Sequence, residues 1–232
     1  LQAAYAAMLH HADQHLARLV AHLEASAQLD NTVIMVLSDN GASQEGGPLG
    51  FVNAMGPYNG LPESMEDKLN RIDDIGGPDT HSNFPWGWSM AANTPLRRYK
   101  QNTHGGGVRD PLIIHWPERV TEPGLRAQFC HACDLVPTLL DSIGIEAPEV
   151  INGIPQKPIE GVSFASTFED ANAVTEKRTQ YFEMFGHRGL IHEGWKAVAY
   201  HPPGTPYEDD EWELFNLDAD FNETKDLSAS EH

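Results

Sequence analysis

The chain has 232 residues, and its 34 acidic side chains outnumber its 15 Lys and Arg side chains, which gives a formal charge of −19. This charge argues against nucleic acid or an anionic membrane surface as the main partner, because both require a positive protein surface. Apolar residues make up 40% of the chain, as in globular domains, and no apolar run approaches the roughly 20 residues of a membrane span. A small anionic substrate is compatible with this composition, since it needs only a few local cations.

A helix and a strand are the first expected elements. Apolar side chains recur every three or four residues over residues 2–27, which predicts an amphipathic helix. The chain begins at Leu1 inside this pattern, with no initiating Met and no visible signal peptide, so we expect a piece of a longer protein. Residues 32–37 form a continuous run of β-branched and apolar residues, which predicts a strand buried on both faces, as in a parallel sheet.

Two polar side chains, those of Asp39 and Asn40, follow this strand. They offer hard oxygen atoms at the carboxyl end of a predicted parallel strand, where open α/β sheets bind ligands. Such oxygen atoms suit calcium or magnesium. The alternative is an ordinary turn in which both side chains bond only to the local backbone.

The next elements are less regular. Residues 42–92 are rich in Gly, Pro and aromatic residues, which predicts a long functional loop with one short helix over residues 64–71. A second strand is expected over residues 111–116. Helices are expected over residues 133–143 and 163–170, with a loop over 144–161 between them. From residue 172 onward, short runs of strand-forming residues predict an antiparallel meander.

Cations and histidines supply the other candidate site residues. Arg97, Arg98 and Lys100 place three cations within four residues of an acidic chain. A lysine ammonium can bind a sulfate or phosphate oxygen, so this cluster is either a cationic site for one such anion or a solvated basic turn. The glycines at 105–107 could present backbone amides to an anion. His104 and His115 flank the second strand, and either is a candidate acid or base, although the apolar surroundings predict a core position for His115.

Taken in order, these segments resemble the sulfatase family, within the wider alkaline-phosphatase-like group. The segments that carry the resemblance are Ser38-Asp39-Asn40-Gly41, Arg97-Arg98-Tyr99-Lys100, His104-Gly105-Gly106-Gly107-Val108-Arg109-Asp110-Pro111 and Glu211-Trp212-Glu213-Leu214-Phe215. The resemblance covers nearly the whole chain and implies an α/β fold. Residues 1–171 would form the C-terminal part of a mixed-sheet catalytic domain whose N-terminal half is absent. Residues 172–232 would form a small antiparallel subdomain.

The resemblance also implies roles for individual residues. In this family the Asp-Asn pair after the strand ligates an active-site calcium ion, so Asp39 and Asn40 are the expected metal ligands, with magnesium as an alternative. The lysine of the R-x-Y-K segment contacts the substrate sulfate, so Lys100 is the expected catalytic and substrate-binding residue. The family usually has Glu at the position of Gly105. We expect this departure to loosen the support around Lys100, and we expect His104 to replace it in part as a substrate-binding residue.

The family nucleophile is a formylglycine made from Cys or Ser in a C/S-x-P-x-R segment, and this sequence contains no such segment. We therefore expect the formylglycine in the missing N-terminal half, and we expect the present chain alone to be inactive. The function implied for the intact protein is arylsulfatase-like hydrolysis of a small sulfate ester. A phosphonate or phosphate ester hydrolase of the same group is one alternative, and a non-catalytic sulfatase-like binding module is the other.

Overall fold

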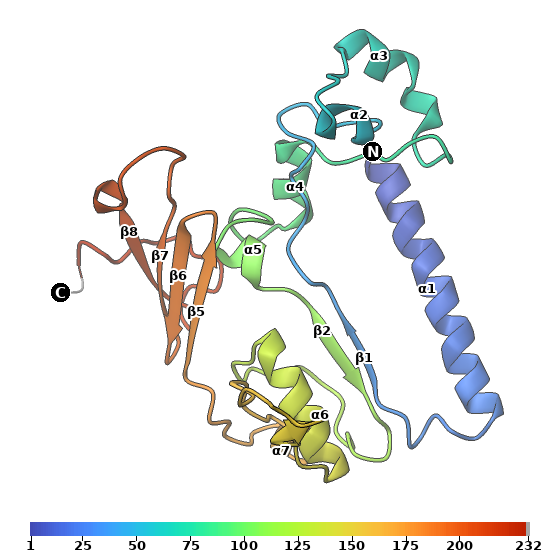
Figure 1. Cartoon of the computed structure of the whole chain (residues 1–232), viewed down its shortest axis with the longest axis vertical. Helices are drawn as coiled ribbons and strands as arrows, with labels where there is room; N and C mark the ends of the chain where they lie inside the picture. Colours follow the sequence, from blue (N-terminus) through green and yellow to red (C-terminus); the bar gives the residue numbers. More distant parts are fainter. Residues whose placement is uncertain (231–232) are drawn as a thin grey trace.

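A computed structural model of the chain describes residues 1–230, and Figure 1 shows their arrangement. Helix α1 (Gln2–Ala25) is a long rod, close to the helix predicted over residues 2–27, and none of its residues is buried. Its N-terminal end lies near α2 and α3, where the ring of Tyr5 packs 5.1 Å from the ring of Phe84. Within residues 1–230, no helix is both long and apolar enough to cross a membrane.

Strands β1 (Ile34–Leu37) and β2 (Leu112–His115) pair antiparallel and form a two-stranded ribbon, which we call the β1–β2 ribbon. The prediction of a parallel strand buried on both faces is therefore wrong. Only one face of the ribbon is covered, since Met35 and Ile114 pack on a cluster formed by Trp116, Phe164 and Phe168. The opposite face is open, and His115 lies on it exposed instead of in the core.

Two short helices lie beside the ribbon (Figure 1), and they contribute Phe168 to this aromatic cluster and Leu135 to its margin. Helix α6 (Leu135–Ile143) follows a 3₁₀ turn, η2 (Ala132–Asp134), and ends where Gly144 adopts a left-handed φ of 69°. Helix α7 (Ser166–Glu169) lies inside the range predicted as helical. The segment predicted as a loop contains a small hairpin of β3 (Val150–Ile151) and β4 (Ile154–Pro155).

The segment between the ribbon strands contains more helix than the sequence predicts. The helical elements are α2 (Met55–Tyr58), α3 (Met65–Asn70), η1 (Ile72–Asp74), α4 (Trp86–Ala92) and α5 (Gly105–Val108). Helix α3 confirms the short helix expected there, and it begins with a capping box in which Ser64 and Asp67 bond to each other's backbone amides. Helix α4 lies in the stretch predicted as irregular.

The C-terminal segment confirms the predicted antiparallel meander. Its strands are β5 (Thr179–Met184), β6 (His187–His192), β7 (Trp195–Ala199) and β8 (Trp212–Asn216), which pair in that order. A 3₁₀ turn, η3 (Tyr207–Asp209), lies in the loop before β8. Val198 and Phe215 are fully buried in this sheet. Lys196, on β7, is also buried, and its ammonium pairs with Glu223.

Candidate active site

Asp39 and Asn40 lie in the loop that directly follows β1. The hydroxyl of Ser38 donates to the carbonyl of Asn40 at 2.8 Å and fixes this turn. The Asn40 amide nitrogen donates to the carbonyl of Gly41 at 3.2 Å, so Oδ1 is the atom that this side chain can offer to a cation. The carboxylate of Asp39 is exposed. The two predicted metal ligands are therefore adjacent, and each presents an oxygen.

A third oxygen donor, Asp110, stands beside this pair at the start of β2. The antiparallel register brings the two strand ends together, because the backbone amide of Ser38 donates to the carbonyl of Pro111 at 3.3 Å. Partial burial and the nearby negative charge of Asp39 raise the pKa of Asp110 to about 6. Within residues 1–230, no group of three His, Cys, Asp or Glu side chains is arranged to hold a metal ion. The role of Asp39 and Asn40 as metal ligands therefore stays a prediction.

The structure brings Lys100 to the loop that carries Asp39 and Asn40. The backbone amide of Lys100 donates to the carbonyl of Ala42 at 3.1 Å. The side chain of Asn93 reinforces this contact, because its Oδ1 accepts from the amide of Ala42 at 3.0 Å. Its Nδ2 donates to the carbonyls of Arg98, at 3.0 Å, and Gly106, at 2.8 Å. The side-chain amide of Asn93 therefore connects three backbone segments of the site.

Gly41 is the point where these segments cross most closely. A side chain at this position would collide with the carbonyl oxygen of Gly106, so only Gly fits. The amides of the triple glycine are already occupied by protein groups: Gly106 donates to the carbonyl of Arg97 at 2.6 Å and Gly107 to that of His104 at 2.9 Å. The prediction that these amides cradle an anion is therefore wrong.

The three cations of the predicted cluster point to different partners. Arg97 pairs with Glu213 at 2.8 Å, and the guanidinium of Arg98 lies 4.5 Å from the ring centre of Tyr200. Only Lys100 lies in the candidate site, where its Nζ is 2.9 Å from Oε2 of Glu45. The interpretation of the cluster as one cationic site is therefore wrong, and anion binding by Lys100 stays a prediction.

His104 is the residue that precedes α5, four residues after Lys100. Its side chain is 1% exposed, and its Nε2 is 2.8 Å from Oε2 of Glu213. Burial lowers the pKa of His104, and the hydrogen bond to Glu213 opposes that effect. The structure thus buries His104, and direct substrate binding by this residue stays a prediction.

A buried ion pair in the C-terminal segment contacts α5. Lys196 and Glu223 are 1% and 2% exposed, and Nζ of Lys196 is 2.5 Å from Oε1 of Glu223. The other carboxylate oxygen accepts from the amide of Gly105 at 3.0 Å. Glu223 also accepts through its backbone carbonyl from Arg97 at 3.0 Å. Sequence reasoning missed this pair, and the only available signal was a lysine inside the apolar run of β7.

Glu223 lies directly beside Gly105. A Cβ atom built at Gly105 would lie 3.3 Å from Oε1 of Glu223, so this carboxylate borders the position of Gly105. The carboxylate of Glu223 bonds to Gly105 and Lys196, so the expected loss of support around Lys100 stays a prediction.

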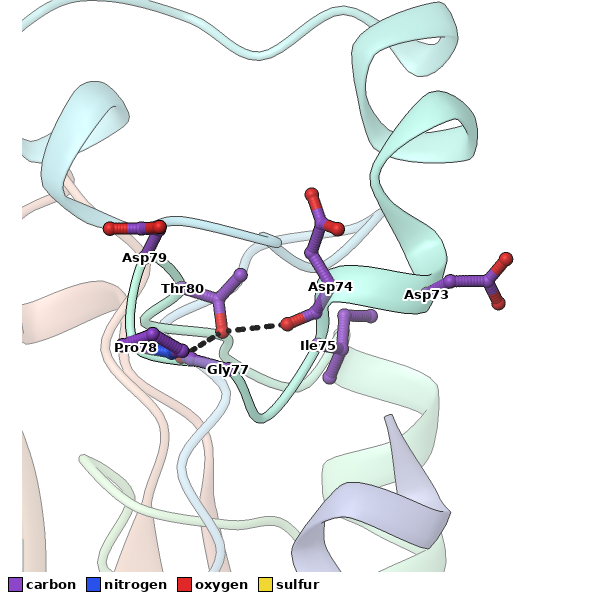
Figure 2. A pocket seen from close by; sticks show the side chains of 7 residues that line it. All are labelled: Asp73, Asp74, Ile75, Gly77, Pro78, Asp79 and Thr80. Atoms are coloured by element: carbon purple, nitrogen blue, oxygen red, sulfur yellow. Dashed lines mark hydrogen bonds between the residues drawn. The ribbon is translucent and has the colours of Figure 1, made fainter.

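A shallow pocket of about 270 Å³ lies elsewhere, between η1 and the residues that follow it (Figure 2). The residues that line it are Asp73, Asp74, Ile75, Gly77, Pro78, Asp79 and Thr80. The hydroxyl of Thr80 donates to the carbonyls of Asp74 and Gly77 and closes the turn. This acidic lining does not suit a sulfate group, and the pocket contains none of the predicted site residues.

Comparisons with known proteins place this arrangement in a family. The Sulfatase family model matches residues 2–145, and the model described as N-sulphoglucosamine sulphohydrolase, C-terminal, matches residues 99–232. The chain belongs to the sulfatase family. Its fold is the α/β, alkaline-phosphatase-like fold of sulfatases, with a four-stranded antiparallel sheet in the C-terminal segment.

Individual relatives agree with this assignment. An uncharacterised sulfatase of Schizosaccharomyces pombe is 28% identical over 230 residues, which covers 97% of this chain and 39% of that protein. A sulfatase of Formosa agariphila is 28% identical over 246 residues, with coverages of 98% and 36%. The crystal structure of Ps i-CgsB in complex with k-i-k-neocarrahexaose has a TM-score of 0.61 at 24% identity, with coverages of 97% and 39%. The chain spans less than half the length of these relatives.

Proposed function

We propose that this chain is part of a calcium-dependent sulfuric-ester hydrolase that acts on a small, arylsulfatase-type sulfate ester. In this proposal Asp39 and Asn40 bind the metal and Lys100 binds the sulfate group. The observation that carries it is the contact between the amide of Lys100 and the carbonyl of Ala42, at 3.1 Å, because it brings the cation to the metal-ligand loop. Membership of the sulfatase family supports the reaction class.

The donor atoms around Asp39 fit a calcium ion. A carboxylate and an amide oxygen are hard ligands, and calcium accepts such mixed oxygen donors in a less regular geometry than the strict octahedron of magnesium. Burial raises the pKa of Asp110, and the negative charge of Asp39 adds to this effect, so a cation bound between the two carboxyl groups would be favourable. When bound, the ion would neutralise charge on the sulfate group and orient the attacking group.

Lys100 would act on the sulfate group directly. Its ammonium carries three donors on a flexible stem, and it can follow the sulfate oxygens as negative charge develops on them. Because no residue of this sequence lies in a C/S-x-P-x-R segment, we propose that a formylglycine outside these 232 residues is the nucleophile. On this proposal, the present chain binds metal and anion but does not turn over substrate.

The metal part of the proposal is tested by calcium titration of this chain in a calorimeter. We expect Asp39→Ala to weaken calcium binding at least about tenfold, since a ligand is lost. Asp13→Ala, which removes an equally exposed carboxylate from α1, is the matched control and should leave the affinity unchanged. Absence of calcium binding, together with no effect of Asp39→Ala, would favour a non-catalytic module.

The catalytic part is tested on the whole protein with paired aryl sulfate and aryl phosphate substrates. We expect Lys100→Ala to lower kcat/KM for the sulfate by about 100-fold or more, because a donor to the transition state is lost. Lys157→Ala removes an exposed lysine and should have no effect. A preference for the phosphate ester, or for a phosphonate ester, would support the phosphoryl-transfer alternative instead.

A further inference from the structure

Glu45 is a charged group of the site that the proposed function does not use. Its Oε2 lies 2.9 Å from Nζ of Lys100, with the two side chains 32% and 29% exposed. The side-chain amide of Gln101 donates to the other carboxylate oxygen, Oε1, at 3.4 Å. Glu45 therefore accepts a hydrogen bond that the Lys100 ammonium could otherwise donate to an anion.

Contacts made by neighbouring residues hold Glu45 in this position. The hydroxyl of Ser43 donates to Oε2 of Glu45 at 2.9 Å, and the carbonyl of Ser43 accepts from the hydroxyl of Ser89 in α4 at 2.7 Å. Gly46 lies so close to the carbonyl oxygen of Phe84 that no side chain fits there. These contacts fix the loop that carries Glu45 against α4.

Lys100 is equally constrained at its own backbone. Arg98, two residues before Lys100, and Gln101, directly after it, have φ angles of 64° and 73°. These angles lie in the left-handed region, which costs energy for residues other than Gly. Such strain persists only where the surrounding structure enforces it. The ion pair is therefore a fixed feature of two well-anchored loops. The hydrogen bond from Lys100 also lowers the pKa of Glu45, so its carboxyl group is ionised at neutral pH.

We propose that Glu45 is an internal counter-ion that a sulfate group has to displace from Lys100. The inference rests on the proposed role of Lys100 in sulfate binding. A sulfate oxygen and the carboxylate of Glu45 compete for the same ammonium protons, and the two anions repel each other. Glu45 would thus weaken the binding of free inorganic sulfate, which is also the product, and favour esters that make further contacts.

The test uses the 232-residue chain with inorganic sulfate as the probe, at constant ionic strength adjusted with NaCl. The shift of the NMR signals of the Lys100 side chain reports the Kd. We expect Glu45→Gln to bind sulfate about fivefold more tightly, because one like charge about 4 Å away in a water-like medium changes a binding constant by roughly this factor. Glu66→Gln, which removes an exposed charge from α3, is the matched control and should keep the wild-type Kd.

Two further variants separate this inference from the proposed function. Glu45→Asp keeps the charge and should stay closer to the wild-type Kd than Glu45→Gln does. Lys100→Gln lacks the reporting side chain, so its sulfate binding is measured by calorimetry beside wild-type protein, and we expect it to be abolished. If sulfate binds wild-type protein through Lys100 but Glu45→Gln binds it equally or more weakly, the counter-ion inference is wrong and the proposed function stands. If sulfate perturbs Lys100 in neither wild-type protein nor Glu45→Gln, the proposed anion site itself is wrong.

Discussion

Asp110 links the charge of the candidate metal site to the stability of the fold. Burial and the charge of Asp39 raise its pKa to about 6, whereas an Asp in an unfolded chain titrates at about 3.9. Between these values the folded chain holds a proton that the unfolded chain has released. The stabilisation from this group is therefore complete below about pH 4, and it is lost as the pH rises through about 6.

We expect this loss to lower the free energy of unfolding by at most about 1 kcal/mol, since Asp110 is only half-buried and solvent screens it. Urea unfolding from pH 4 to 7, in buffer with a calcium chelator, gives the free energy of unfolding of wild-type protein and of Asp110→Asn. The change of their difference with pH measures the loss. Asp39→Asn should move the transition to lower pH, because it removes one cause of the shift. An identical pH dependence in wild-type protein and Asp110→Asn would contradict the assignment.

At the scale of single residues, the sequence predicts the site residues that stand in short motifs. It misses those whose partners lie far away in the sequence. Asp39, Asn40 and Lys100 stand in short motifs, and the structure brings these motifs together. Glu45 and Glu223 have no such signature, because they meet their partners across 55 and 118 residues, respectively. Only the folded chain shows that their carboxylates reach the loop of Lys100.

At the scale of elements, the crossing of two loops at Gly41 sets the distance between the predicted metal ligands and Lys100. A Cβ at Gly41 would collide with the carbonyl of Gly106, so we expect Gly41→Ala to destabilise the fold by about 1–3 kcal/mol. Gly87→Ala in α4 is the matched control, because nothing lies within 4 Å of its added Cβ. That variant should gain about 0.5–1 kcal/mol from helix propensity. Urea unfolding that gives both variants the same stability would contradict the close crossing.

The elements themselves were predictable where side-chain pattern decides them. Periodicity indicated α1, and runs of strand formers indicated the four-stranded meander, because both patterns record which side chains are covered. The direction of β1 was not predictable in this way. A continuous apolar run does not specify the strand that pairs with it, and the partner, β2, lies on the far side of a long insertion.

At the scale of the whole molecule, the β1–β2 ribbon favours association between chains and the net charge opposes it. Within residues 1–230 each ribbon strand pairs with one neighbour, so its outer edge is open, and Ile113 is 61% exposed on the uncovered face. Open, apolar strand edges favour association with other chains. The charge of −19 opposes association by repulsion between molecules.

We therefore expect the chain to self-associate increasingly as NaCl rises from about 0.1 to 1 M, because the screening length falls from about 10 to 3 Å. Light scattering at a fixed protein concentration measures this. Ile113→Lys should reduce the association, whereas Val174→Lys, which adds the same charge at a 78% exposed position away from the ribbon, should have a smaller effect. Equal effects of the two variants would mean that the ribbon is not the associating surface.

Glu223 joins α5 to the C-terminal sheet. Its carboxylate accepts from the amide of Gly105 at 3.0 Å and pairs with the ammonium of Lys196 on β7. Shortening the chain before this residue would therefore leave a buried ammonium without its counter-charge, which is a strongly destabilising change.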